Sequence, residues 1–578
     1  MKRRERILLL VLTFMLLTAV TAFAADGNPA QANAARLGLW TILPPLVAIT
    51  LAFITKNVVL SLSLGVLTGT FLMSLNGGNV FQALFNAFLA FIDRIVACLA
   101  DPWNAGIILQ CMTIGGLIAL VSKMGGAKAI AESLAKKAKT PVSAQLITWL
   151  LGVLVFFDDY ANSLIVGPIM RPVTDKMRVS REKLSFIVDA TAAPIAGLAL
   201  ISTWVGYEIS LIKDAFEAVG QATNAYGVFV STIPYRFYNI LILMFIVFTA
   251  IFLKEFGPML KAERRARSTG KVIADDAKPM VSDEATGLEP KEGIKLSIWN
   301  AIIPIGILIF GALLAFYYNG YKAIMGGEDA EVIKILTNSP LSFAAIRETF
   351  SAADASIVLF QSALVASIVA IVMGMSQKIF TLSEAIDTWI QGMKSLIITA
   401  VILLLAWSLS GVTKELGTAV FLASKLSSTL PAFLLPTLIF VLGSIISFAT
   451  GTSYGTMGIL MPLAIPLAFA INPTHSYVIM SAGAVLTGAI FGDHCSPISD
   501  TTILSSMGSA CDHIDHTNTQ MWYSLAVAAI TIICGYIPVG LGIPVYIVLP
   551  ISIVVTGLLV YFVGKPVEVD EEKTSIKA

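Results

Sequence analysis

Three stretches of this 578-residue chain place acidic, hydroxyl and amide side chains within apolar surroundings. They cover residues 156–163, 449–456 and 491–502. Oxygen atoms of these groups are the ligands that hard cations such as Na⁺ prefer, and a glycine among them lets the chain leave a helix and free its carbonyls. The candidate ligands are Asp158, Asp159, Asn162, Ser163, Thr450, Gly451, Thr452, Ser453, Asp493, Ser496, Ser499, Asp500 and Thr501.

The acidic residues of these stretches also permit proton chemistry. Burial removes a carboxylate from water and favours its protonated form, so a buried carboxylate can release H⁺ when Na⁺ arrives. An Asp in mid-bilayer costs about 3 kcal/mol, and two adjacent ones, Asp158 and Asp159, therefore indicate a function or a partner. The alternatives are an interfacial turn at 158–159 and a helix-packing surface of small residues at 449–456.

Composition defines the elements that must hold these groups. Of all residues, 56% are apolar and 13% charged, with a mean hydropathy of +0.83, against about 45–50% and 25% in soluble domains. A soluble enzyme and a disordered chain are excluded, and a net charge of +1 provides no nucleic-acid footprint. We predict an all-α polytopic membrane protein that is not an enzyme.

No cofactor or structural metal is expected. The five cysteines are scattered and form no CxxC pair. Zinc at His494-Cys495 is disfavoured because adjacent residues rarely chelate together. The chain also lacks a GxxxxGK[ST] phosphate loop, so we expect no ATPase activity.

The amino terminus resembles a targeting segment. A basic stretch at 2–6, an apolar run from Ile7 to Val20 and the sequence Ala22-Phe23-Ala24 are the three parts of a secretory signal. We interpret residues 1–24 as a signal peptide or an uncleaved first span, and 25–37 as a polar segment.

Eleven apolar stretches are each expected to cross the membrane, for which about 20 residues are needed. They are Gly38–Thr55, Val58–Leu75, Asn104–Val121, Leu184–Trp204, Tyr235–Leu253, Ile298–Tyr318, Ser356–Met375, Ser395–Gly411, Val478–Phe491, Trp522–Ile537 and Ile543–Val563. Prolines at 194 and 497 mark expected helix breaks.

Two further apolar tracts contain a polar break at mid-length. Val142–Pro172 and Pro431–Ala470 are each predicted to form a re-entrant hairpin of two half-length helices, because irregular backbone at membrane depth needs protein or water around it. An amphipathic segment precedes each tract, at Phe81–Phe91 and Leu382–Met393, and is expected to lie along the membrane surface.

Lys and Arg are unevenly distributed between alternate loops. The outer loops at 76–103 and 206–234 and their borders carry only Arg94, Lys213 and Arg236, which the positive-inside rule requires. We predict a first transmembrane repeat at 38–256, a cytoplasmic linker at 257–296, a second inverted transmembrane repeat at 297–542, and a final span with a cytoplasmic tail at 543–578.

The two halves are similar in sequence around the hairpins. At a constant offset Gly126 aligns with Gly417 and Gly152 with Gly443, and one residue of slippage later Ser163 aligns with Ser453. Under the predicted topology the two hairpins enter from opposite sides. Inverted repeats with broken helices are typical of secondary transporters.

The polar motifs resemble those of the NhaC-type Na⁺/H⁺ antiporter family. The segments are GDHCSPISDTT (492–502), FFDDYANSLIVGPIMRPVTDK (156–176) and FATGTSYGTMGILMPLA (448–464). The resemblance extends from about Gly38 to Val563. It implies an inverted-repeat ion transporter of a bacterial inner membrane.

We therefore expect a secondary active transporter that exchanges Na⁺ and H⁺ in turn by alternating access. The alternative is Na⁺- or H⁺-coupled exchange of small organic acids or amino acids, which the absence of Arg or Lys from the presumed core disfavours. A channel or receptor is a third class. The expected partners are small ions or solutes and the lipid bilayer, and a homodimer is left open.

Overall fold

The computed structural model describes residues 29–568 except 56, 76–78, 280–289, 291–292, 328–329, 395, 419, 422–424 and 426–429. The predicted signal peptide or first span at 1–24, residues 25–28, part of the predicted linker and the tail beyond 568 lie outside the described residues.

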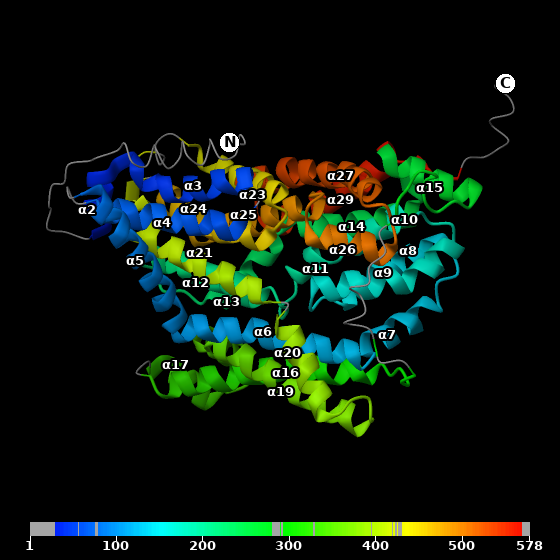
Figure 1. The fold of residues 1–578 in the computed structure, drawn as a ribbon, viewed down its shortest axis with the longest axis horizontal. Coiled ribbons are helices and arrows are strands. Elements are labelled where there is room, and N and C mark those ends of the chain that lie inside the picture. The colour runs from blue at the N-terminus through cyan, green and yellow to red at the C-terminus, as the bar shows by residue number, and fades with distance from the viewer. Residues whose placement is uncertain are drawn as a thin grey trace.

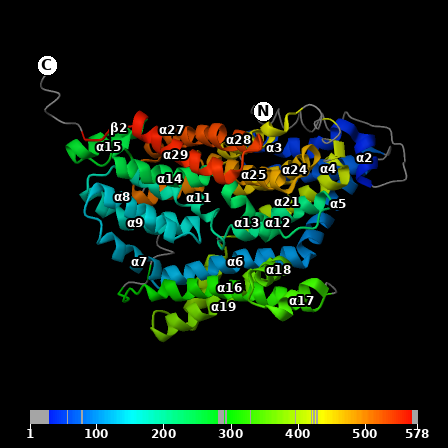
Figure 2. The same ribbon diagram turned by 180° about the vertical axis from the view of Figure 1, so that it is seen from behind.

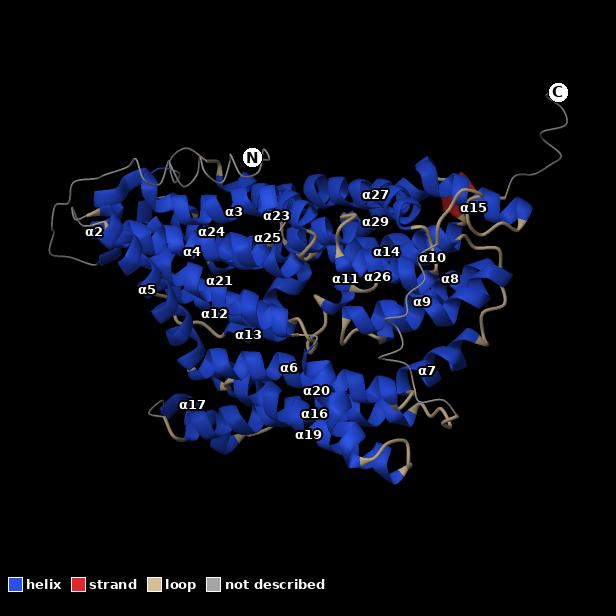
Figure 3. Ribbon diagram, viewed as in Figure 1, coloured by secondary structure: helices blue, strands red, loops and turns tan. Residues whose placement is uncertain are grey.

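Helices make up nearly all of the described chain (Figure 3). Eleven of them are long and apolar enough to cross a membrane, or up to twelve with a bent pair, Ala225–Tyr235 with Phe237–Phe252. The predicted all-α polytopic membrane fold is confirmed. A two-residue antiparallel pairing joins β1 (Lys254–Glu255) to β2 (Lys565–Pro566).

The first half of the chain contains short and long helices in alternation. Its elements are α2 (Pro29–Leu37), η1 (Gly38–Ile42), α3 (Leu43–Thr55), α4 (Val58–Ser74), α5 (Val80–Ala100), α6 (Pro102–Lys123), α7 (Gly126–Ala135), α8 (Pro141–Leu154), α9 (Asp159–Lys176), α10 (Arg181–Ala190), α11 (Ala193–Ala196), α12 (Val205–Ala218), α13 (Ala225–Thr232), η2 (Ile233–Tyr235), α14 (Phe237–Phe252) and α15 (Gly257–Thr269).

The second half begins with the longest single helix. Its elements are α16 (Trp299–Met325), α17 (Ala330–Asn338), α18 (Phe343–Ala352), α19 (Ala355–Ser376), α20 (Leu382–Lys394), α21 (Ile397–Leu416), η4 (Ala432–Leu434), α23 (Leu435–Thr450), α24 (Ser453–Ile471), α25 (His475–Cys495), α26 (Asp500–Ser509), α27 (His513–Ile530), the π-helix η5 (Thr531–Tyr536), α28 (Ile537–Gly540) and α29 (Val545–Val563).

Most helices run along the long axis of the molecule (Figure 1). At one end of the bundle α23, α24 and α25 pack with α3, α4 and α21; toward the other end α8, α9 and α10 pack with α14, α26 and α27 (Figures 1 and 2). A further layer is built from α6, α16, α19 and α20, so helices from both halves of the chain share it.

Both apolar tracts with a polar break form helix–turn–helix hairpins. The first is α8–α9 with a break at 155–158, and the second is α23–α24 with a break at 451–452. Their helices have 14, 18, 16 and 19 residues. At 1.5 Å per residue, the 14 residues of α8 reach about 21 Å, as expected of a half-length helix, whereas both arms of the second hairpin are long enough to span a membrane.

The predicted span Leu184–Trp204 is wrong in its second part. Helix α10 ends at Ala190, and apart from the four residues of α11 the chain does not resume a long helix until α12 at Val205. Pro194, which has no backbone donor, occupies the first turn of α11. The predicted outer loop 206–234 instead contains α12, which packs against α6, α21 and α24.

Two surface elements also differ from expectation. The predicted amphipathic segment 81–91 continues as α5 to Ala100 and is capped at its start by Asn79. Helices α17 and α18 lie between α16 and α19, where no helix was predicted. The amphipathic helix predicted at 382–393 agrees with α20 to within one residue.

The same sequence of element types occurs in both halves: an amphipathic helix, a long helix, a hairpin and a broken helix. A glycine in the left-handed region follows the long helix in each half, Gly125 at φ 70° and Gly417 at φ 72°. Such a backbone favours glycine over residues with a Cβ. The inverted relation of the two halves and the domain bounds stay predictions.

Candidate functional site

Asp493 is held at the start of α24, near the end of α25. One carboxylate oxygen, Oδ2, accepts hydrogen bonds from the Ser453 hydroxyl (2.7 Å) and backbone N–H (3.2 Å). The other, Oδ1, accepts from the Ser499 hydroxyl at 2.7 Å. The side chain is 3% exposed. The N-terminus of a helix favours negative charge, so the second hairpin's tip helps to stabilise a carboxylate of the broken helix.

Gly451 brings this tip against the break in α25–α26. Its φ of +68° lies in the left-handed region, and a Cβ there would come within 2.7 Å of the Ile498 carbonyl oxygen. The Ser496 hydroxyl donates to the Phe448 carbonyl at 2.8 Å, which joins the same two segments. Pro497 lies between the end of α25 and the start of α26.

The hydroxyls of Thr450 and Thr452 serve their own hairpin. Thr450 donates to the Ile446 carbonyl at 2.9 Å. Thr452 caps α24 by accepting from the Gly455 N–H at 3.5 Å. The hydroxyls of Thr450 and Thr452 therefore stabilise the turn and form no hydrogen bond to the Asp493 carboxylate among those described.

Asp500 differs from the other acidic residues because it is exposed, as are Pro497 and Ile498. This carboxylate lies at the first residue of α26, directly after the helix break. The Tyr160 hydroxyl donates to Asp500 Oδ2 at 2.5 Å, and Thr501 continues the polar surface through its hydroxyl, 2.9 Å from that of Ser499.

Asp158 and Asp159 lie at the tip of the first hairpin and are 6% and 3% exposed. The carboxylates of Asp158 and Asp500 lie close enough to Asp159 to interact with it electrostatically. Tyr160 is the residue that links this tip to the α26 break, and the sequence analysis did not select it. Its position directly after the two acids was the signal available.

Asn162 and Ser163 tie the first tip to its surroundings. The Asn162 amide donates to the carbonyls of Gly152 (2.7 Å) and Thr191 (2.8 Å), so it bonds its own hairpin to the end of α10. The Ser163 hydroxyl lies 3.0 Å from that of Ser505 on α26. Ser505 was also not selected, although it lies one helical turn from Thr501 on the same face.

One short segment contacts both hairpin tips. The Thr203 N–H donates to the Phe157 carbonyl at 3.1 Å, and the Trp204 ring lies 4.8 Å from the Tyr454 ring. The Tyr207 hydroxyl donates to the Tyr454 carbonyl. Both tips therefore meet the 202–204 segment, which follows the broken helix of the first half.

The core also contains basic side chains, contrary to expectation. Arg236 and Lys183 are fully buried. Arg236 forms an ion pair with Glu208 at 2.6 Å, and Lys183 forms one with Glu255 at 2.8 Å. Charges taken out of water require such partners, so each buried cation is matched by a carboxylate outside the proposed ligand set.

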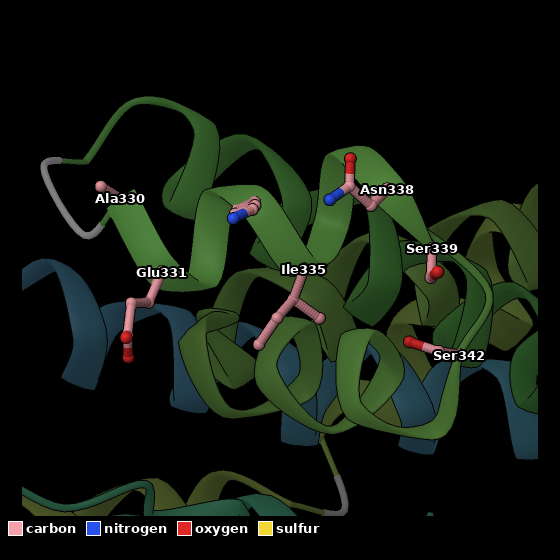
Figure 4. Close-up of a pocket in the computed structure, with 7 residues that line it drawn as sticks. Ala330, Glu331, Ile335, Asn338, Ser339 and Ser342 are labelled. Atoms are coloured by element: carbon pink, nitrogen blue, oxygen red, sulfur yellow. The ribbon is translucent and has the colours of Figure 1, made fainter.

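A cation at this site would be bound by both carboxylate and hydroxyl oxygens. Within the described ranges, no three His, Cys, Asp or Glu side chains converge as a metal cluster would require. A surface pocket of about 760 Å³ is lined by α17 and the turn after it, including Lys334 and Asn338 (Figure 4). It contains none of the proposed ligands.

Membrane-spanning helices around broken segments with buried carboxylates define a secondary transporter. Comparison with known proteins identifies the family within this class. Residues 6–199 and 195–541 match the model of the Na⁺/H⁺ antiporter family, and the chain belongs to that family.

Individual relatives agree with this assignment. An uncharacterized protein of Haemophilus influenzae is 34% identical over 507 residues, which cover 87% of this chain and 91% of that protein. The Na⁺/H⁺ antiporter NhaC of Alkalihalophilus pseudofirmus is 34% identical over 26% of this chain and 31% of its own. The malate-2H⁺/Na⁺-lactate antiporter of Bacillus subtilis is 42% identical over 18% of this chain and 20% of its own.

Proposed function

We propose that this antiporter exchanges Na⁺ and H⁺ in turn by alternating access, with Na⁺ bound by oxygens that the hairpin tips and the α25–α26 break supply. The observation that carries the proposal is the Asp493 carboxylate. It is buried, bonded to Ser453 and Ser499, and forms no ion pair with any described Lys or Arg. Na⁺ would supply the missing positive charge.

The ligand set centres on Asp493. The hydroxyls of Ser453 and Ser499 offer neutral oxygens beside its carboxylate, as a hard cation prefers. Asp500 and Tyr160 extend the polar surface toward the exposed side of the break, and Asp159 reaches it from the first hairpin. A proton on one of the buried carboxylates would cancel one negative charge while Na⁺ is absent, so Na⁺ binding and proton release would be coupled.

The geometry gives no support to the alternative of organic-acid exchange. An organic anion would need a cationic partner in the core, and the buried Arg236 and Lys183 already pair with Glu208 and Glu255. The match to the malate/lactate antiporter covers less than a fifth of the chain.

Everted membrane vesicles with a pH-sensitive dye test the proposal. Addition of Na⁺ alone should dissipate an imposed pH gradient, and malate or lactate should add nothing. Asp275→Asn, at an exposed residue paired with Lys271, is a control expected to transport normally. A response that requires an organic acid in addition to Na⁺ would contradict the proposal.

The orientation in a bacterial inner membrane is part of the same proposal. The β1–β2 pairing and the contact of Arg267 with Glu568 at 3.4 Å support a location of α15 and residues 565–568 on the same side of the membrane. The distribution of Lys and Arg supports the cytoplasm for that side. A cysteine introduced by Ser268→Cys should resist an impermeant thiol reagent on intact cells, and labelling from outside would contradict this orientation.

A further inference from the structure

A second buried carboxylate, Asp189 on α10, lies outside the proposed Na⁺ ligands. Its Oδ2 accepts from the Gln520 amide at 2.8 Å, and its Oδ1 accepts from the Ser505 hydroxyl at 3.4 Å. The Nε2 atom of His516 lies 3.9 Å from Oδ2. Asp189, His516 and Gln520 are fully buried. The neighbours of Asp189 thus include a group that can carry a proton.

A row of hydrogen bonds connects His516 to the surface. Its Nδ1 lies 2.8 Å from the Ser506 hydroxyl, which lies 3.1 Å from Nδ1 of His513. His513 is half-buried, and its Nε2 lies 2.7 Å from the carbonyl oxygen of the exposed Pro497. The row therefore begins at the open side of the α25–α26 break and ends beside Asp189.

The partners of each atom determine which groups donate. The Pro497 carbonyl can only accept, so His513 must carry a proton on Nε2. The Gln520 amide nitrogen is occupied by Asp189 and the His494 carbonyl, so its oxygen faces His516 Nε2 at 2.9 Å and must accept from it. The donor and acceptor roles of these groups follow from the partners of each atom.

A count of protons follows from these roles. The four hydrogen bonds of the row need four protons, and two neutral histidines plus one serine hydroxyl supply three. One extra proton completes the row, as an imidazolium at His513 or at His516. The Ser506 hydroxyl also lies 2.8 Å from the Thr502 carbonyl, which can accept its proton when both histidine Nδ1 atoms donate to the serine oxygen.

We propose that Asp189 is the binding site of the transported proton, and that His513, Ser506 and His516 relay the proton between it and the surface. This rests on the proposed Na⁺/H⁺ exchange and assigns the proton to a carboxylate that does not bind Na⁺. His513 Nδ1–H passes to the Ser506 oxygen as the serine proton passes to His516 Nδ1. The Nε2–H of His516, which the Gln520 oxygen accepts in this structure, then passes to Asp189 Oδ2 when the 3.9 Å separation of these two atoms shortens to hydrogen-bond distance, and both histidines are left neutral.

The surroundings of Asp189 couple the proton to the cation. The titratable groups facing it from other helices are His516 on α27, Asp493 and Cys495 on α25, and Tyr238 on α14. Na⁺ at Asp493 would cancel the negative charge that favours a proton on Asp189. Asp512 and Asp515 are the acidic residues beside His513 and would attract protons to the entrance.

The test uses the full-length protein in proteoliposomes and two assays. Na⁺-driven proton movement is followed with an internal pH dye, and exchange of radioactive Na⁺ for unlabelled Na⁺ is measured at equal pH. We expect Asp189→Asn to abolish proton movement, and Ser506→Ala to slow it by about a hundredfold or more, which is the lower limit of proton-transfer contributions. Both variants should keep Na⁺/Na⁺ exchange within about twofold.

Matched variants separate the relay from packing. Ser509 lies on the same helix as Ser506, and its buried hydroxyl has no hydrogen-bond partner among the described residues. The Ser509→Ala variant should therefore behave as wild type in both assays. Ser506→Thr keeps a hydroxyl and should restore proton movement.

Wild-type proton movement in Asp189→Asn or Ser506→Ala would overturn the proposal, as would equal losses in both assays. Absence of Na⁺-driven proton movement in the wild type would instead overturn the proposed function.

Discussion

The two broken helices place similar sequences in different chemical surroundings. Each has an aspartate shortly before a proline: Asp189 before Pro194 in the first half and Asp493 before Pro497 in the second. Two serine hydroxyls donate to Asp493, whereas Asp189 is accompanied by an amide, a nearby histidine and one serine hydroxyl at 3.4 Å. Oxygen ligands suit a hard cation, and a histidine beside a carboxylate suits proton transfer. Under the proposal, these two positions serve different ions.

The hairpin tips show a second contrast. The first tip contributes carboxylates, Asp158 and Asp159, while the second contributes a positive helix terminus, a glycine and hydroxyls. Because Phe157 of the first tip and Tyr454 of the second contact the same 202–204 segment, movement of either hairpin would change the environment of both. This supports a site that is assembled between the halves.

The largest effect is expected from Asp493→Asn. The change keeps the shape of the side chain and removes the charge that Na⁺ would neutralise. Na⁺-driven proton movement in vesicles should fall by about a hundredfold or more, in line with removal of a directly interacting group. Asp275→Asn is the control, and wild-type rates in Asp493→Asn would place the Na⁺ site elsewhere.

A buried carboxylate that has a cationic partner should respond differently. Arg236→Leu leaves Glu208 buried without its ion pair, which costs about 3–5 kcal/mol. The midpoint of thermal unfolding in detergent should therefore drop strongly. The double variant Arg236→Leu with Glu208→Leu should recover much of the lost stability. If the double variant recovered neither stability nor yield, a structural role for this pair would be contradicted.

Gly451→Ala tests the contact of the second tip with the break. The left-handed backbone costs about 1–2 kcal/mol for a residue with a Cβ, and the Ile498 carbonyl must move to make room. We expect a drop of about tenfold in Na⁺ transport with normal membrane insertion, measured as dye response per unit of inserted protein. Gly270→Ala, at a left-handed glycine with open space around it, should leave transport unchanged.

The smallest effect concerns Glu263 on α15, outside the spanning helices. Burial and the nearby Glu255 carboxylate raise the pKa of Glu263 to about 7. The folded state then holds a proton that the unfolded state has released between about pH 4.5 and 7, so this group's contribution to stability falls as the pH rises through that window. Glu263→Gln should flatten the decline by about 1–3 kcal/mol, measured as unfolding midpoints at pH 5 and pH 8. An unchanged slope would contradict this.

Much of the fold could be predicted because apolar runs and polar interruptions are local signals. The break at 155–158 falls where acidic residues interrupt an apolar run, and Gly451 ends α23 in a conformation that glycine favours. The helix break was predicted at Pro194, but α10 already ends at Ala190. The proline marks the start of α11 rather than the end of α10.

Long-range partners could not be predicted in the same way. Arg236 was assigned to the edge of an outer loop, but its partner Glu208 lies 28 residues earlier in the sequence and only packing brings them together. His516 lies in the polar sequence 512–516, yet it is fully buried. The role proposed for His516 depends on two contacts. One is with Ser506 on the neighbouring helix α26, and the other is with Gln520, one turn further along α27.

Na⁺ binding to the purified protein, measured by calorimetry at several pH values, tests the central claim most directly. The account predicts that wild-type affinity for Na⁺ weakens as the pH falls, that Asp493→Asn binds no Na⁺, and that Asp189→Asn binds Na⁺ with little dependence on pH. Undiminished Na⁺ binding by Asp493→Asn, or a wild-type pH dependence in Asp189→Asn, would contradict it.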